Sequence, residues 1–538
     1  MPATTSPETE PPARLARESM QAYLVGGGIA SLAAAVYLIR DGRLPGQSIH
    51  IFEASQFGGS LDASGSAAAG YSMRGSRMFG PAYVLTYELL AEIPSLDDPT
   101  RSVTQDTFEF WQAEPWSDRA RLVEQGVAVD ISHWGLSNKD RVDLMGLMLR
   151  PETALGITPV AACFEPHFFE THFWLMWCSM FGFETWHSAT ELRRYLLRFL
   201  RLFPDLEGLQ VIQSTRYNGF EAIVRPLLRW LLAQGVHMET GIEVTDLHLE
   251  PCAAGQAVRR LDCLRSGVPT RVEVGPHDLV IATLGSMTAN ASPGSMDSPP
   301  SPFTGQPDAS WTLWQRLAAK NSAFGNPSAF CGHVEQTRWV TFTVTDTGDL
   351  FARHMAALSA SPAGRGGLVT LVNSNWRLTF HLFHPPAYAD QPANVQVWWG
   401  YGLLVDCIGN FVPKTLLACS GREILVELFS HLALQDDLEA LLGSANCIPC
   451  LLPFATSQFM PRAPGDRPAV LPTGTTHLAL IGQYCEIPHD VVYTVEYSIH
   501  SARLAVTGLL GLKDEMPPTY QGLEHPNAMM EALKMILR

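Results

Sequence analysis

AYLVGGGIASLAAAVYLIRDG, residues 22–42, sets the architecture expected for this chain. Its first four residues predict a short buried strand, the glycines at 26–28 a tight turn, and residues 29–41 a helix with small residues on one face. A strand that turns directly into a helix is the first half of a βα unit. The N-terminus of such a helix points free N–H groups at an anion, so the stretch predicts a phosphate-binding turn.

A second apolar strand is predicted over residues 48–52, and it ends at Glu53, 25 residues beyond Gly28. An acidic residue at this place accepts hydrogen bonds from both ribose hydroxyls of a dinucleotide, while the helix N-terminus holds the pyrophosphate. Ser31 stands where the usual fingerprint has its third glycine. The order of these elements predicts a dinucleotide site whose first contacts are Gly26, Gly28, Ile29, Ala30, Ser31, Glu53 and Ala54.

The next two motifs favour FAD over NAD. Gly58, Gly59 and Ser60 follow the acidic residue, and Arg74-Gly75-Ser76-Arg77 follows after a loop of small residues. The arrangement resembles flavoproteins of the glutathione reductase and amine oxidase type, in which the second glycine pair and the arginine lie along the pyrophosphate and flavin. The alternative is that these glycines only turn a loop and both arginines are solvated. A second Gly-x-Gly-x-x-Gly between a strand and a helix is not found, so a pyridine nucleotide has no evident place.

A late segment is expected to close the same site. Residues 478–484 predict a strand that ends at Gly482, and residues 494–498 could begin a helix. The nucleotide domain is therefore expected to be discontinuous. The fold class expected is α/β, with a Rossmann-like FAD-binding domain, a mixed α+β substrate-binding domain and helical segments.

Domain boundaries follow from this pattern. The expected parts are a disordered N-terminal tail (1–21), an FAD-binding domain in three pieces (22–150, 206–290 and 466–510), a helical aromatic-rich substrate region (151–205), a substrate-binding domain (291–465) and a C-terminal segment (511–538).

Composition excludes several classes of protein. The chain has 538 residues, 46% hydrophobic and 17% charged, with a formal net charge of −16. It is long enough for two or three domains and apolar enough to bury a large core, and its acidic balance opposes nucleic-acid binding. Glycines interrupt the apolar residues 22–39, which argues against a membrane helix. Ten scattered cysteines fit a reducing cytoplasm, and Cys447 and Cys450 are expected to be ordinary buried thiols rather than a redox or zinc pair.

The chain between residues 164 and 203 is unusually aromatic. Part of this pattern has helical spacing and is explained by helices packed on helices. The same stretch contains polar groups that a dry core would reject unless each were paired: His172, Glu184, His187, Arg193 and Arg194. An apolar cavity with a few placed polar groups would also suit a lipid.

Seven segments in order resemble the oleate hydratases, also called myosin cross-reactive antigens. They cover the chain from about residue 22 to 507 and read GGGIASLAAAVYLIRDG, FEASQFGGSLD, RGSRM, FWLMWCSMFGFETWHSATELRRYLLRF, YNGFEAIVRPL, GDRPAVLP and DVVYTVEYSIHSA. The resemblance implies a hydro-lyase of fatty acid metabolism that binds FAD without net redox change. Its implied substrate is an unsaturated fatty acid such as oleate, hydrated at the cis-9 double bond to a 10-hydroxy acid.

The resemblance also implies roles for single residues. The family's alkene-protonating tyrosine matches Tyr195 in RRYLLRF, and its flavin contacts match the glycine loop, Glu53 and the Gly58 segment. The water-activating glutamate of the family falls on Met78, and the glutamine of its YNQY segment falls on Gly219. By spacing, its carboxylate-binding threonine and asparagine fall on Ser444 and Asn446. Two of the expected functional groups are thus replaced.

Two other classes of protein stay open on these residues. One is a redox flavoenzyme of the amine oxidase, desaturase or isomerase type, and the other is a non-catalytic binder of flavin and lipid, which Met78 suggests. The expected protein is cytoplasmic, without stable insertion in a membrane, although transient membrane contact is left open. A monomer and a homodimer are equally acceptable.

Overall fold

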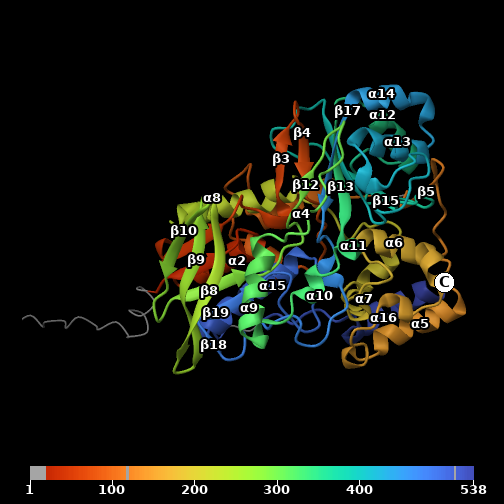
Figure 1. Ribbon diagram of the computed structural model, residues 1–538. Helices are drawn as coiled ribbons and strands as arrows, with labels where there is room; N and C mark the ends of the chain where they lie inside the picture. Colours follow the sequence, from red (N-terminus) through yellow and green to blue (C-terminus); the bar gives the residue numbers. More distant parts are fainter. Residues whose placement is uncertain (1–19, 117–119, 514–515) are drawn as a thin grey trace, which may run out of the picture.

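The computed structural model describes residues 20–116, 120–513 and 516–538 (Figure 1). Of the tail expected over residues 1–21, residues 1–19 lie outside the described residues. Within the described parts, no helix is both long and apolar enough to cross a membrane.

A parallel sheet of five strands forms the first layer, in the order β19-β11-β1-β2-β7. The strands are β1 (Ala22–Val25), β2 (Ile49–Glu53), β7 (His237–Thr240), β11 (Leu279–Thr283) and β19 (Leu478–Ile481). Three distant stretches of sequence therefore contribute to one sheet. The short strands at the two ends of the chain, expected from the apolar runs there, are confirmed.

Two helices pack against each other beside this sheet, α2 (Ile29–Arg40) and α15 (Val495–Leu510). Ala33, Ala34 and Ala35 of α2 are fully buried, because small side chains let the two helices approach closely. Figure 1 shows α2 and α15 side by side, although their sequences are far apart. The helices expected after the glycine turn and after residue 494 are both present.

A second, mostly antiparallel sheet lies beside the first. It contains β8 (Ile242–Cys252), β9 (Gly255–Arg265), β10 (Val268–Glu273) and the short parallel strand β18 (Thr475–Thr476). Helix α9 (Ala309–Lys320) packs on β8. The contact buries Trp311 and Trp314 in a core that also receives side chains from the parallel sheet.

The largest sheet has eight strands in the order β12-β17-β13-β16-β15-β14-β5-β6. Its strands are β12 (Ser292–Pro293), β17 (Ala445–Leu452), β13 (Trp339–Asp346), β16 (Gln396–Gly402), β15 (Leu378–Leu382), β14 (Val369–Leu371), β5 (Leu122–Glu124) and β6 (Val127–Ala128). Strand β13 is buried along its whole length. Figure 1 shows α12 (Leu350–Ser359), α13 (Gly421–His431) and α14 (Leu438–Ser444) gathered at one end of this sheet.

The position of β5 differs from the expected domain boundary at residue 150. Leu122 and Val123 pair in parallel with Thr370 and Leu371, so this piece of the early chain belongs to the large sheet. The side chains of Leu122 and Val123 are buried there. Strand pairing over such a separation depends on tertiary packing, which a local apolar pattern does not specify.

The aromatic middle of the chain is helical. It contains α6 (His172–Phe181) and α7 (Ala189–Arg198), flanked by α5 (Asn138–Leu149) and by the C-terminal helix α16 (Pro526–Leu537). Gly182 ends α6 with φ +77°, a left-handed conformation that favours glycine. The fold is thus α/β with a Rossmann-like parallel sheet, a mixed second part and helical segments, as expected.

Glu496 on α15 joins the late helix to α3 (Val84–Leu90). Its buried carboxylate accepts hydrogen bonds from the N–H of Leu85 (2.9 Å) and from the N–H (2.8 Å) and hydroxyl (2.6 Å) of Thr86. Helix α3 has no side-chain cap at its N-terminus. Glu496 therefore satisfies N–H groups that would otherwise be left without a partner.

We expect Glu496→Ala to lower the free energy of unfolding by about 3 kcal/mol, because three buried donors lose one acceptor. Urea denaturation of the purified protein measures this change. The exposed Glu109, paired with Arg101 on the surface, is a control, and Glu109→Ala should cost less than about 1 kcal/mol. Equal losses in the two variants would contradict the capping role.

Candidate functional site

A cavity of about 410 Å³ lies at the carboxyl ends of the parallel strands β1, β2, β11 and β19. This edge of an open parallel sheet is where such folds bind ligands. The cavity is lined by the glycine turn and Glu53, by Arg74, and by chain segments near Val244, Ser286 and Gly482.

Glycines make the turn narrow enough for a ligand to approach the backbone. Gly26 has φ +96° and Gly59 φ +55°, both left-handed conformations. A Cβ on Gly27 would lie 2.5 Å from Phe57 Cδ1, and a Cβ on Gly59 would lie 3.2 Å from Gly28 Cα. The two glycine loops therefore pack directly against each other, and this cradle fits a dinucleotide pyrophosphate at the N-terminus of α2.

Glu53 is held by the turn itself. Its Oε2 accepts a hydrogen bond from the N–H of Gly27 (2.6 Å), and its Oε1 accepts one from the N–H of Ser55 (2.9 Å). Oε1 also accepts a hydrogen bond from the Ser55 hydroxyl (3.3 Å), whereas Oε2 has a further lone pair for a ribose hydroxyl. The side chain is thus oriented before any ligand binds.

Most of the expected cofactor contacts lie in this cavity. Its lining includes Gly26, Gly28, Ile29, Ala30, Glu53, Ala54, Gly59, Ser60, Arg74 and Gly482. The lining does not include Ser31, Gly58, Gly75, Ser76 and Arg77. The Ser31 hydroxyl lies 3.2 Å from that of Thr283, and Gly58 forms an isolated bridge with Gly28.

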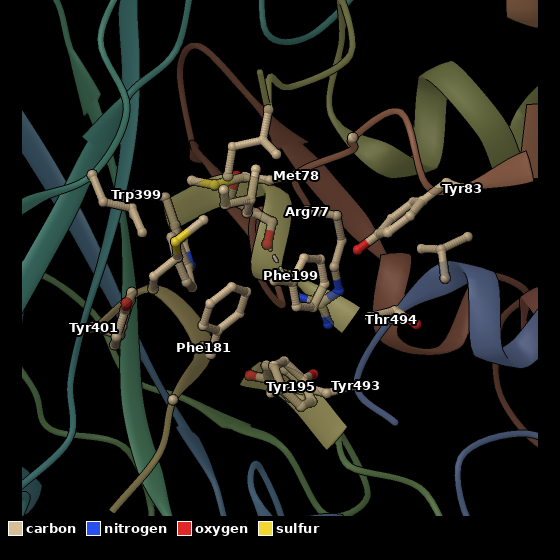
Figure 2. Close-up of a pocket in the computed structure, with 18 of the residues that line it drawn as sticks. Arg77, Met78, Tyr83, Phe181, Tyr195, Phe199, Trp399, Tyr401, Tyr493 and Thr494 are labelled. Carbon is tan, nitrogen blue, oxygen red and sulfur yellow. Dashed lines mark hydrogen bonds between the residues drawn. The ribbon is translucent and has the colours of Figure 1, made fainter. Parts of the chain in front are cut away.

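A second cavity, of about 100 Å³, lies beyond Arg77 (Figure 2). Aromatic side chains from distant segments enclose it: Tyr83, Phe181, Tyr195, Phe199, Trp339, Trp399, Tyr401 and Tyr493. Figure 2 shows Trp399 and Tyr401 on one side of Phe181, and Tyr83 and Arg77 on the other. We call this space the aromatic cavity. Sequence patterns indicated Tyr195, but they did not indicate Trp339, Trp399 and Tyr401, which come from strands of the large sheet.

Tyr195 faces the aromatic cavity from α7 and is 1% exposed. This burial excludes the alternative in which its hydroxyl lies at the surface. The hydroxyl donates a hydrogen bond to the Val492 carbonyl, with an O···O distance of 2.5 Å. Burial, together with nearby Tyr83 and Tyr493, raises the pKa of Tyr195 well above its ordinary value. The phenol therefore keeps its proton at neutral pH.

Arg77 forms the wall between the two cavities. Its side chain lines the aromatic cavity, while its Nη2 donates to the carbonyl of Ser60 (3.3 Å), a residue of the nucleotide cavity. The guanidinium lies over the Tyr493 ring, 5.6 Å from its centroid. Of the two arginines expected along the pyrophosphate and flavin, Arg74 lines the nucleotide cavity and Arg77 stands between the two cavities.

Met78 lines the aromatic cavity, and so does Ser76. Among the described residues that line this cavity, none is an aspartate or glutamate. The thioether of Met78 cannot accept a proton from water. Any acid–base chemistry in this space must therefore use phenols, the guanidinium or water itself.

The three residues suggested for a substrate carboxylate lie outside the aromatic cavity. The Ser444 hydroxyl donates to the carbonyl of Leu441 (3.3 Å), and the amide of Asn446 donates to the carbonyl of Ala69 (3.2 Å). Gly219 lies against Leu61. The structure does not gather these three residues around Tyr195.

Ion pairs hold α7 in place, with Glu191 at their centre. Fully buried Glu191 pairs with Arg467 (2.9 Å) and with Arg462 (3.1 Å). Arg194 of the same helix pairs with Glu152 and Glu486 (both 2.8 Å). Tyr195 lies one turn beyond Glu191, so these contacts fix the helix that carries it.

Comparisons with known proteins show the family of this chain. The family model described as the MCRA family matches residues 19–507. The oleate hydratase of Streptococcus pyogenes serotype M49 (strain NZ131) is 34% identical over 529 residues, covering 96% of this chain and 89% of that protein. The linoleate hydratase of Lactiplantibacillus plantarum is 30% identical over 557 residues, covering 96% of this chain and 98% of that protein.

Solved structures share the fold at low sequence identity. A putrescine oxidase has a TM-score of 0.52 at 11% identity, covering 91% of this chain and 99% of that one. An oxidase from Exiguobacterium sp. 255-15 has a TM-score of 0.51 at 13% identity, covering 92% of this chain and 99% of that one. These matches show that the chain shares the α/β fold of these two oxidases.

Glu486 makes stability depend on pH. Arg467, Arg194 and Arg462 lower its pKa from 4.5 to about 2, against the opposing effect of burial. A depressed pKa in the folded state contributes stability that is present above the unfolded value and lost as pH falls through the folded value. We therefore expect the free energy of unfolding to fall between about pH 4.5 and pH 2. Urea denaturation across this range should show a shallower fall in Glu486→Gln, but an unchanged one in the exposed control Glu439→Gln.

Proposed function

Because the chain belongs to the MCRA family, we propose that it is a fatty acid hydratase. The proposed reaction adds water to the cis-9 double bond of oleate and similar unsaturated fatty acids and gives 10-hydroxy acids. The observation that carries this proposal is the buried, protonated phenol of Tyr195 in the aromatic cavity, next to the nucleotide cavity at the carboxyl ends of the parallel strands.

FAD is the group that we propose for the nucleotide cavity. The glycine turn would hold its pyrophosphate, Glu53 its ribose, and the segments at Ser60, Arg74 and Gly482 the part nearest the flavin. When bound, the flavin would place polarised groups near the double bond, without net redox change. The neighbouring wall residue, Arg77, contacts Ser60 and Tyr493 and would lie between cofactor and lipid.

A lipid chain suits the aromatic cavity chemically. About fifteen buried methylenes at ~0.8 kcal/mol each would contribute on the order of 12 kcal/mol before the costs of binding. Ligand pockets usually measure about 300–1,000 Å³, whereas this cavity measures about 100 Å³. It therefore accommodates the reacting part of the chain, and side chains around it have to move to admit the rest.

Tyr195 Oη supplies the proton in the proposed reaction. The O–H bond breaks as a C–H bond forms on one alkene carbon, and positive charge develops on its neighbour. Water adds to that carbon, and the proton that the bound water loses restores the phenol. The faces of Phe181 and Phe199, 5.0 and 5.4 Å from the Tyr195 ring between centroids, would stabilise the developing cation.

Met78 offers no carboxylate that could accept a proton from the attacking water. A positioned base contributes roughly 10²- to 10⁴-fold to such a step. A carbocation is reactive enough to be attacked by water whose proton passes to another water or to a phenolate. The proposed enzyme is therefore active without the family's glutamate, but slower than a relative that has it.

Two further assignments belong to the proposal. Ser444, Asn446 and the backbone at Gly219 remain candidates for the substrate carboxylate, which in oleate lies far from the double bond and so beyond the aromatic cavity. A cytoplasmic location is supported by ten cysteines that are all free thiols.

We expect Tyr195→Phe to lower the rate of hydration by about 10²- to 10⁴-fold, because the proton donor is removed while the ring stays. The measurement is incubation with oleate in heavy-oxygen water, followed by mass spectrometry of the product. Tyr388→Phe is a matched control, since Tyr388 also donates from a buried site to a backbone carbonyl, that of Ser72 (2.9 Å). Unchanged label uptake in Tyr195→Phe would remove Tyr195 from its role.

The same incubation separates the alternatives. A non-catalytic binder would incorporate no label at a chain carbon. A redox flavoenzyme would reduce its bound flavin when substrate is added without oxygen, whereas the hydratase should leave the flavin spectrum oxidised.

We expect Met78→Glu to raise kcat by at least about tenfold at pH values where the new carboxyl is ionised, because it restores a base beside the cation. Met78→Gln has nearly the same shape but no basic oxygen, so it should leave kcat near that of the natural protein. Steady-state rates on oleate measure both. An equal effect of the two variants would show that shape alone is responsible.

A further inference from the structure

The segment Val492-Tyr493-Thr494 lies between the two cavities and has an unusual backbone. Tyr493 has φ +71°, a left-handed conformation that bulky side chains rarely adopt. Such a conformation costs about 1–3 kcal/mol and persists only where neighbours hold it. The segment is also functional in position, since Tyr493 and Thr494 line the aromatic cavity and the Val492 carbonyl binds the hydroxyl of Tyr195.

The side chain of Gln483 holds this segment by both ends of its amide. Its Oε1 accepts a hydrogen bond from the N–H of Tyr493, and its Nε2 donates to the Thr494 carbonyl (2.9 Å) and to the Ser498 hydroxyl (2.8 Å). The partners fix the amide orientation, because an N–H requires the oxygen and a carbonyl requires the nitrogen. A glutamate carboxylate could only accept, and methionine could do neither at normal strength.

Gln483 contacts the segment 492–494 from the side of the nucleotide cavity. It follows β19 directly after Gly482 and lines the nucleotide cavity, together with Ser498. The chain of contacts thus runs from the nucleotide cavity through the Gln483 amide to the backbone of Tyr493, the adjacent Val492 carbonyl and the Tyr195 hydroxyl. A ligand that contacts Gln483 acts on the same backbone that orients the phenol.

We infer that Gln483 is a positioning residue that couples occupancy of the nucleotide cavity to the placement of Tyr195 and Tyr493 in the aromatic cavity. The effect on turnover rests on the proposed function, whereas the coupling between the two cavities does not. Gln483 touches neither the double bond nor the reacting water. Its action goes through the backbone of residues 492–494.

The test compares Gln483→Met and Gln483→Glu with the natural protein. Gln483→Met removes the hydrogen bonds of the amide to Tyr493, Thr494 and Ser498. We expect kcat on oleate to fall by about 10- to 100-fold while KM changes by less than about threefold. Gln483→Glu keeps the acceptor for Tyr493 but loses the donor to Thr494, and its kcat should fall between the other two. A loss of folded enzyme would also lower the apparent kcat without changing KM, so kcat is calculated per mole of flavin-loaded protein.

A second readout needs no turnover. The dissociation constant of FAD is measured by flavin fluorescence with and without stearate, a saturated fatty acid that has no double bond to react. In the natural protein we expect stearate to change the FAD dissociation constant by about fivefold or more, which is the lower end of ordinary coupling. In Gln483→Met the two constants should agree within about twofold.

Gln391→Met is the matched control. Gln391 also clamps backbone by both ends of its amide, accepting from the N–H of Ala387 (2.7 Å) and donating to the carbonyl of Val395 (2.7 Å), and it lines neither of the two cavities. Its loss should leave the coupling and the ratio of kcat to KM unchanged.

The outcomes are distinct. If Gln483→Met keeps both kcat and the stearate effect, the inference is wrong. If the natural protein shows coupling that Gln483→Met lacks, but no hydration of oleate, the inference stands for binding and the proposed reaction fails.

Discussion

The buried ion pairs around α7 are the contacts on which the site depends. Glu191 and Arg467 have fully buried side chains, and removal of two charges from water costs several kcal/mol per ion. Such buried ion pairs therefore add little net free energy of unfolding. Their geometry is exacting, because each charge must meet its partner at hydrogen-bond distance. A rotation of α7 that moved Tyr195 out of the aromatic cavity would break the contacts of Glu191 and Arg194 together, so the helix has one acceptable register.

Local patterns predicted the parts of the fold that depend on local chemistry. The strand, glycine turn and helix at residues 22–40 follow from apolar runs and from the glycines at 26–28, of which Gly26 is left-handed, and they appear with nearly the expected bounds. Strand β5 could not be placed in this way, because its partner is β14, far along the chain. The lining of the aromatic cavity was unpredictable for the same reason. Tyr195 was identified through a motif, but Trp399 and Tyr401 come from a strand, and the alternation of residues along a strand does not specify which element its side chains face.

The contacts of Arg77 between the two cavities could not be predicted from the sequence either. An arginine after a glycine loop suggests a phosphate partner, yet the Arg77 guanidinium stacks on Tyr493 and bonds to the Ser60 carbonyl. Whether a cation meets a phosphate or an aromatic face depends on the path of both loops. The contacts of the Gln483 amide were even less predictable from the sequence. Its three partners lie in residues 493–494 and at the start of α15, and the left-handed conformation of Tyr493 brings them together.

The five-stranded parallel sheet has a consequence for biosynthesis. A ribosome releases the chain from its N-terminus, so β1 and β2 emerge well before β19 and α15. Until then the apolar edge of β11 and the alanine face of α2 lack their neighbours, and both are surfaces on which nascent chains aggregate. The nucleotide cavity is incomplete until Gly482 and Gln483 have been made. The cavity is therefore completed late in synthesis, and the yield of folded protein on expression should be sensitive to the supply of chaperones.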